Sequence, residues 1–241
     1  VPQVTVTAGG GNDQLVANVN GSDFLVTAGN QGTITVRNSA ATPASAVSQF
    51  FGVESLVGNS GNDRFEFLNS GTLTGSIDGN IGSDTLVGDS DGNIFTVTAE
   101  DAGTLAGKVT GGFFEIENLT GGLASDTFNV NADINGSISG LAGQDVVIVA
   151  DGVTVAGSID AGSAADQLTF GNNTVVGGAV TGGSGNDTLT IQGAIAASIG
   201  GGAGDDIFVL TAASRVTGTL DGGADIDEIR ASNTATTFVI S

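Results

Sequence analysis

Aspartate recurs along this chain at a nearly constant spacing, each time after a glycine-rich stretch. The segment Gly182–Thr190 (GGSGNDTLT) reappears as Gly201–Val209 (GGAGDDIFV), and degraded copies place six further aspartates in the same setting. The full set is Asp63, Asp84, Asp126, Asp145, Asp166, Asp187, Asp206 and Asp227. Successive gaps are 21, 42, 19, 21, 21, 19 and 21 residues. A period near 21 predicts stacked coils that bring these carboxylates into a row.

A row of stacked carboxylates has two chemical uses. Hard carboxylate oxygens are the ligands that Ca²⁺ prefers, so the row is a candidate calcium ladder, best formed at Asp187 and Asp206. Alternatively, each carboxylate accepts backbone N–H bonds from its own turn. Bare carboxylates about 5 Å apart would repel one another. We therefore expect either a cation or a hydrogen-bond donor at every position in the row.

Short alternating strands must position this row. Each aspartate precedes apolar residues at every second position, such as Leu189 and Ile191. About 14 residues after the aspartate a second strand follows, typified by Val180 or Ile199. Period-two alternation places these side chains on one face, and the glycines supply the turns. The pattern predicts an all-β, right-handed parallel β-solenoid with coils of about 21 residues.

Stacking is needed because one coil cannot bury its own apolar face. The period places Leu189 between Leu168 and Phe208, so the core becomes a set of continuous ladders. With 241 residues, about eleven coils are expected, in a rod of roughly 50 Å. Both ends of the sequence are apolar and strand-like. We therefore expect end-to-end self-association or a longer chain of the same fold.

A longer repeat accounts for the one gap of 42 residues. Leu15–Ile34 aligns with Leu86–Leu105 at an offset of 71, and Phe50–Leu56 aligns with Phe113–Leu119 at an offset of 63. The difference of eight predicts one inserted loop, at residues 40–47. Residues 13–63 and 84–126 are then related double-coil segments within a single solenoid spanning 1–241. The alignment adds Asp13 to the candidate calcium ladder.

Composition limits the possible partners. The net charge is −21 with five basic residues, so we expect no binding to nucleic acid. No apolar run is long enough to form a membrane span. Cysteine is absent, which rules out disulfides and thiolate metal sites. Glycine makes up 41 of the 241 residues, which is far above average usage.

The motif Gly-Gly-x-Gly-x-Asp-x-apolar-x resembles that of the RTX repeat proteins. Gly182–Thr190 and Gly201–Val209 match it fully, while the other copies lose one or more glycines. Phe51–Leu56 and Phe114–Gly122 also resemble linking stretches of large bacterial adhesins and S-layer proteins. The resemblance implies export, and it implies Ca²⁺ in the glycine-rich turns. RTX coils carry a motif at both edges, whereas these coils carry one, so at most one row of ions is implied.

The residue types favour a structural role over catalysis or ice binding. The solenoid and its apolar ends favour an extracellular, non-catalytic structural protein of a fibre, biofilm matrix, adhesin or S-layer. An enzyme would need acid–base groups, and this chain has no His and only scattered basic residues. Ice binding would need a regular Thr array, but the position after the aspartate varies too much. A glycan-binding module and a calcium-binding spacer of a giant secreted adhesin stay open as alternatives.

Overall fold

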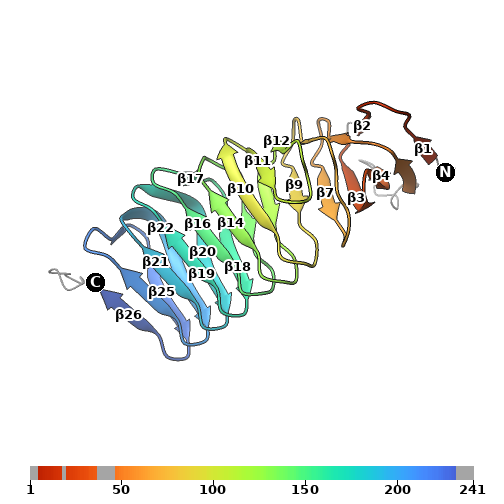
Figure 1. Cartoon of the computed structure of the whole chain (residues 1–241). Coiled ribbons are helices and arrows are strands. Elements are labelled where there is room, and N and C mark those ends of the chain that lie inside the picture. The colour runs from red at the N-terminus through yellow and green to blue at the C-terminus, as the bar shows by residue number, and fades with distance from the viewer. Residues whose placement is uncertain (1–4, 18–19, 37–46, 232–241) are drawn as a thin grey trace.

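The chain folds into a β-solenoid of about eight turns, seen as a rod of stacked coils in Figure 1. This computed structural model describes residues 5–17, 20–36 and 47–231. Every regular element in those ranges is a strand, and the first strand, β1, and the last, β26, lie at opposite ends of the rod. The described ranges contain no helix long and apolar enough to cross a membrane. The predicted all-β solenoid with coils of about 21 residues is confirmed.

Sheet A is the fourteen-stranded sheet, and its strands run along one side of the rod. Their order is β1 (Thr5–Thr7), β5 (Val47–Phe51), β4 (Gln31–Val36), β3 (Ser22–Ala28), β7 (Arg64–Phe67), β9 (Thr85–Val87), β13 (Asn118–Thr120), β15 (Ile138–Ser139), β18 (Ile159–Ser163), β20 (Thr174–Ser184), β22 (Ala194–Ala203) and β24 (Arg215–Val216). Two more strands join it, β17 (Thr154–Val155) on β20 and β25 (Leu220–Ala224) on β22.

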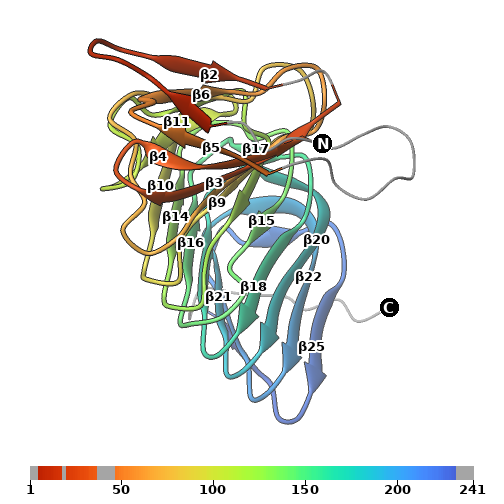
Figure 2. The ribbon, with the colours of Figure 1, turned by 90° about the vertical axis from the view of Figure 1, so that its right-hand side faces the viewer.

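Sheet B is the twelve-stranded sheet, which faces sheet A across the core (Figure 2). Its order is β2 (Gln14–Val16), β6 (Ser55–Val57), β8 (Ile77–Asp78), β12 (Phe113–Phe114), β11 (Ala102–Leu105), β10 (Ile94–Ala99), β14 (Thr127–Val130), β16 (Val146–Val149), β19 (Gln167–Phe170), β21 (Thr188–Ile191), β23 (Ile207–Leu210) and β26 (Glu228–Ala231).

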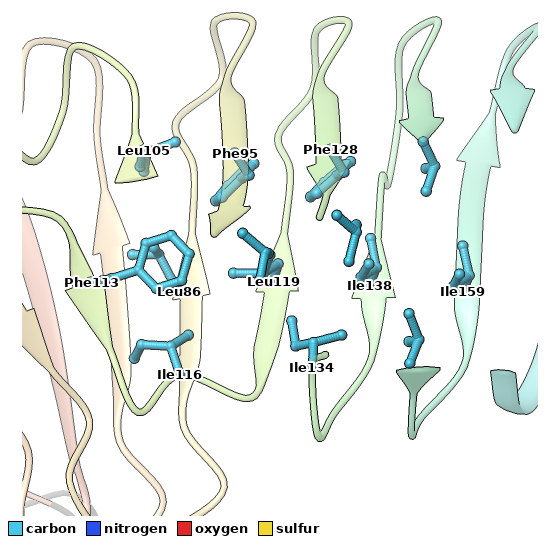
Figure 3. Packing of buried hydrophobic residues seen from close by; sticks show 14 of the residues in the cluster. Leu86, Phe95, Leu105, Phe113, Ile116, Leu119, Phe128, Ile134, Ile138 and Ile159 are labelled. Carbon is cyan, nitrogen blue, oxygen red and sulfur yellow. The ribbon is translucent and has the colours of Figure 1, made fainter. Parts of the chain in front are cut away.

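The core is a set of ladders in which each residue stacks on its equivalent in the next coil. Leu168 pairs with Leu189, and Leu189 pairs with Phe208, as the sequence predicts. Every second residue of each strand is buried, because alternate side chains point to opposite faces. The rings of Phe95 and Phe128 stack at a centroid distance of 4.9 Å. Figure 3 shows Phe95 and Phe128 on neighbouring coils of this core.

The two double-coil segments have the same order of strands but start in opposite sheets. In the first, β2 lies in sheet B and the antiparallel strands β3, β4 and β5 lie in sheet A. In the second, β9 lies in sheet A and β10, β11 and β12 lie in sheet B. The strand that follows a motif aspartate therefore changes sheet across each segment. It lies in sheet B at the start of the first segment (β2), in sheet A after the first segment (β7) and at the start of the second (β9), and in sheet B again after the second (β14). The predicted loop lies outside the described residues except for Val47, where β5 begins.

The turns number about eight rather than the expected eleven. The double-coil segments explain part of the difference, because β4 and β11 run antiparallel to their neighbours. Each adds a strand to a sheet without completing a turn. A coil of 19 residues stacks on one of 21 residues where β20 pairs with β22. Val175 pairs with Ala196 at an offset of 21, and after a shift in register Ala179 pairs with Ser198 at an offset of 19.

Truncating one residue of the core ladder should destabilise the rod strongly. Leu189→Ala should lower the free energy of unfolding by about 3 kcal/mol, because it leaves a cavity between two neighbouring coils. Thr190→Ala, on the outward face of the same strand, should change it by less than about 0.5 kcal/mol. Urea unfolding followed by circular dichroism measures both. Equal effects would show that Leu189 is not a core residue.

Candidate functional site

Six of the nine candidate aspartates form one hydrogen-bonded row where the chain enters sheet B. We call this the long row, and it comprises Asn93, Asp126, Asp145, Asp166, Asp187, Asp206 and Asp227. In each step the backbone N–H of one member donates to Oδ1 of the member in the following coil. The N–O distances are 2.7, 2.7, 2.7, 2.8, 2.8 and 3.1 Å from the Asn93–Asp126 step to the Asp206–Asp227 step.

Two more candidates lie in a second row, where the chain enters sheet A. This short row comprises Ser22, Asp63, Asp84 and Glu117. The N–H of Ser22 donates to Asp63 Oδ1, and that of Asp63 donates to Asp84 Oδ1 at 2.5 Å. The N–H of Asp84 donates to Glu117 Oε2 at 2.6 Å. The motif therefore forms two rows rather than one, because the second double-coil segment moves it from sheet A to sheet B.

Asp13, the ninth candidate, belongs to neither row. It precedes β2, the first strand of sheet B, and its N–H donates to Glu54 Oε2 at 2.8 Å. Glu54 thus accepts the N–H of Asp13 in the same way as Glu117 accepts the N–H of Asp84. The direction of the hydrogen bond is the same as in both rows, from the earlier coil to the later one.

Four members of these hydrogen-bonded chains do not belong to the motif. Ser22, Asn93, Glu54 and Glu117 are not aspartates, so a search for the motif aspartate does not mark them. The longer repeat does contain the signal. Its offset of 71 relates Ser22 to Asn93, and its offset of 63 relates Glu54 to Glu117. Each pair occupies equivalent positions, which identifies both as sites that continue the hydrogen-bonding pattern of an aspartate.

The row carboxyl groups are buried, and burial changes their acidity. Seven motif aspartates, from Asp63 to Asp206, are at most 1% exposed. Loss of hydration raises the pKa of Asp84, Asp145 and Asp187 to about 7, although the N–H donor at each opposes this. Charges of neighbouring carboxylates raise these pKa values further. Desolvation likewise raises the pKa of Asp126, Asp166, Asp206 and Glu117.

The second carboxyl oxygen explains the first glycine of the motif. Oδ2 of Asp187 is buried without a hydrogen-bond partner, and a Cβ built on Gly182 would lie 2.2 Å from it. At Asp206 the same point, on Gly201, lies 2.1 Å from Oδ2 and 2.5 Å from the carbonyl oxygen of Gly222. The glycine leaves room for the carboxyl group.

Ca²⁺ takes six to eight oxygen ligands, and the described residues do not gather such a set around the row carboxyl groups. Oδ1 of each long-row aspartate already accepts a backbone N–H, and the carboxyl groups point into the core. No three acidic side chains within the described ranges are grouped so that they could hold a metal ion. The donors at the row carboxyl groups are instead backbone N–H groups of the neighbouring coil. Asp63 and Asp126 also accept at Oδ2 from their own turns, from the N–H groups of Asn59 at 3.0 Å and Gly122 at 2.6 Å.

No family model matches this chain, and a search of curated proteins finds no sequence that matches it.

Proposed function

We propose that this protein is an extracellular, non-catalytic structural protein whose rods join end to end in a fibre, biofilm matrix, S-layer or adhesin. The open core of the last coil carries this proposal. Ile229, the inward residue of β26, is 48% exposed, whereas Phe208 in the preceding coil is 1% exposed. An apolar ladder whose last described residue is half exposed favours addition of another coil.

Sheet A ends in the same way. Val216 of β24 and Leu220 of β25 pack against the core but stay partly exposed, while their partners Ile195 and Ile199 are 1% exposed. At the other end of the rod, Val6 and Leu15 are likewise only partly buried. Both ends thus present apolar residues along the rod axis.

A non-catalytic role is supported by how the charged side chains are used. The row aspartates from Asp63 to Asp206 are buried and bonded to backbone N–H groups, so they do not face a substrate. Among the described basic residues, Arg64 pairs with Glu66 at 3.0 Å on the surface. Lys108 pairs with the buried carboxylate of Asp89 and also donates to a backbone carbonyl. Both basic side chains are therefore engaged within the rod.

An extracellular location is supported by the composition and the motif. The high acidic charge keeps a long rod soluble and separates neighbouring rods laterally. The glycine-rich aspartate motif resembles the repeats of exported bacterial proteins, and a chain without cysteine tolerates an oxidising environment. Together with the open ends, these features favour growth along the rod axis over side-by-side association.

Electron microscopy of the purified chain tests the proposal. We expect filaments that lengthen with protein concentration and persist when a calcium chelator is added. Ile229→Lys should shorten them, because it places a charge on the open core. Ile226→Lys is the matched control, because Ile226 lies on the turn before Asp227 and is 81% exposed. Single rods at every concentration would contradict the proposal.

A further inference from the structure

The hydrogen bonds of the long row have a direction, and this direction makes the two ends of sheet B different. Each backbone N–H donates to the carboxyl group of the following coil. Asp227 accepts from Asp206 at 3.1 Å, but no described residue accepts the N–H of Asp227 itself. At the last described coil of the sheet, this donor is therefore not used by any described residue.

Asp13 presents the complementary acceptor at the other end. It precedes the first strand of sheet B, just as Asp227 precedes the last. Its own N–H donates to Glu54, in the same direction as in the rows. Oδ2 of Asp13 is buried without a hydrogen-bond partner, as it is in Asp187 and Asp206. In the rows it is Oδ1 that accepts from the preceding coil, and Oδ1 of Asp13 accepts from no described residue.

The spacing of apolar residues around the two aspartates is also the same. Leu220 and Ile229 lie seven residues before and two residues after Asp227, and Val6 and Leu15 lie at those distances from Asp13. One offset of 214 residues therefore relates both strands of the first coil to both strands of the last. The terminal strands all pair parallel with their neighbours, so a second copy can add without reversing direction.

We propose that a second copy of this chain adds in this register, with the Asp227 N–H of one copy donating to the Asp13 carboxyl group of the next. Strand β26 then pairs with β2, and β25 pairs with β1. Ile229 stacks on Leu15, and Leu220 stacks on Val6, which closes the open apolar ladders. This inference rests on the end-to-end assembly proposed above and specifies its interface.

Disulfide trapping tests the register, because the native chain has no cysteine. The double variant Gln14→Cys/Glu228→Cys places two cysteines opposite each other on β2 and β26, both at exposed positions. Directly opposed residues on neighbouring strands lie about 5 Å apart, which a disulfide can span. The ends of one rod lie far apart (Figure 1), so any disulfide must join two copies.

The register-shifted control is Gln14→Cys/Arg230→Cys. Its cysteines would lie about 8 Å apart in the proposed register, which is beyond the reach of a disulfide. After mild oxidation we expect a ladder of multimers on a non-reducing gel from the first variant and at least tenfold less from the second. Filaments without this difference would overturn the register and leave the proposed function standing. Single rods without cross-links would overturn both.

Discussion

The free energy of unfolding is expected to fall as the pH rises from about 4 to about 8. The row aspartates are the cause, because burial raises the pKa of Asp84, Asp145 and Asp187 from 3.8 to about 7. Between these values the folded chain keeps protons that the unfolded chain has released. Stability is then complete below pH 4 and is lost progressively as the pH approaches the folded-state pKa. Above about pH 8 the curve should level off.

Asparagine substitution in the long row tests the origin of this pH dependence. Asp145→Asn together with Asp187→Asn keeps an Oδ1 acceptor for each backbone N–H. Asn93 shows that an asparagine side chain fits at a row position, where its N–H donates to Asp126. The double variant should unfold at a higher temperature than the native chain at pH 8, and its melting temperature should depend less on pH. Asp221→Asn, which removes one exposed carboxylate on β25, is the control and should keep the native pH profile.

Thermal unfolding at intervals of one pH unit, in buffers of constant ionic strength with a chelator present, gives these profiles. The sign is the decisive feature. Ordinary ion-paired aspartates have lowered pKa values and make a protein less stable as the pH falls. A melting temperature that rises between pH 4 and pH 8 would therefore contradict a raised pKa of the row carboxyl groups in the folded chain.

Gly202→Ala is expected to be among the most damaging single substitutions in the chain. The residue has φ of +122°, which a side chain rarely tolerates, and an added Cβ would lie 2.0 Å from the carbonyl oxygen of Gly183. That oxygen belongs to the backbone of the neighbouring coil, so it cannot rotate away. We expect a loss of about 3 kcal/mol or more in the free energy of unfolding.

Gly200→Ala is a matched control on the same strand. Its φ is not in the left-handed region, and its added Cβ would meet nothing closer than 3.9 Å. The free energy of unfolding should change by less than about 1 kcal/mol. Urea unfolding of the two variants side by side measures the difference. Similar losses at both positions would show that the coils do not stack as closely as the structure indicates.

The period of the aspartates was sufficient to predict the fold. It sets which residues stack, so the Leu168–Leu189–Phe208 ladder follows from spacing alone. The number of turns does not follow, because β4 and β11 are antiparallel strands that spacing cannot distinguish from another coil. The signal for these strands is instead local, because the two-residue turns Gly29–Asn30 and Glu100–Asp101 reverse the chain between β3 and β4 and between β10 and β11.

The chemistry of the rows was harder to predict than their existence. Sequence spacing brings the carboxylates together, but the pattern does not say whether they point toward solvent or into the core. The structure points them inward, where the N–H of Asp166 reaches Oδ1 of Asp187 at 2.8 Å. Glycine five residues before the aspartate is consistent with either orientation. Its role as the space occupied by Oδ2 emerges only from the packing of one coil on the next.

If buried carboxyl groups rather than bound metal ions connect each coil to the next, the pKa values of these groups must be raised in the folded chain. NMR spectroscopy of the chain labelled with ¹³C at the aspartate carboxyl carbons tests this most directly, in a titration from pH 3 to pH 9 without divalent cations. We predict that Asp84, Asp145 and Asp187 titrate near pH 7 and stay protonated at pH 5. Titration of these groups near pH 4, or folding that requires added Ca²⁺, would contradict the prediction.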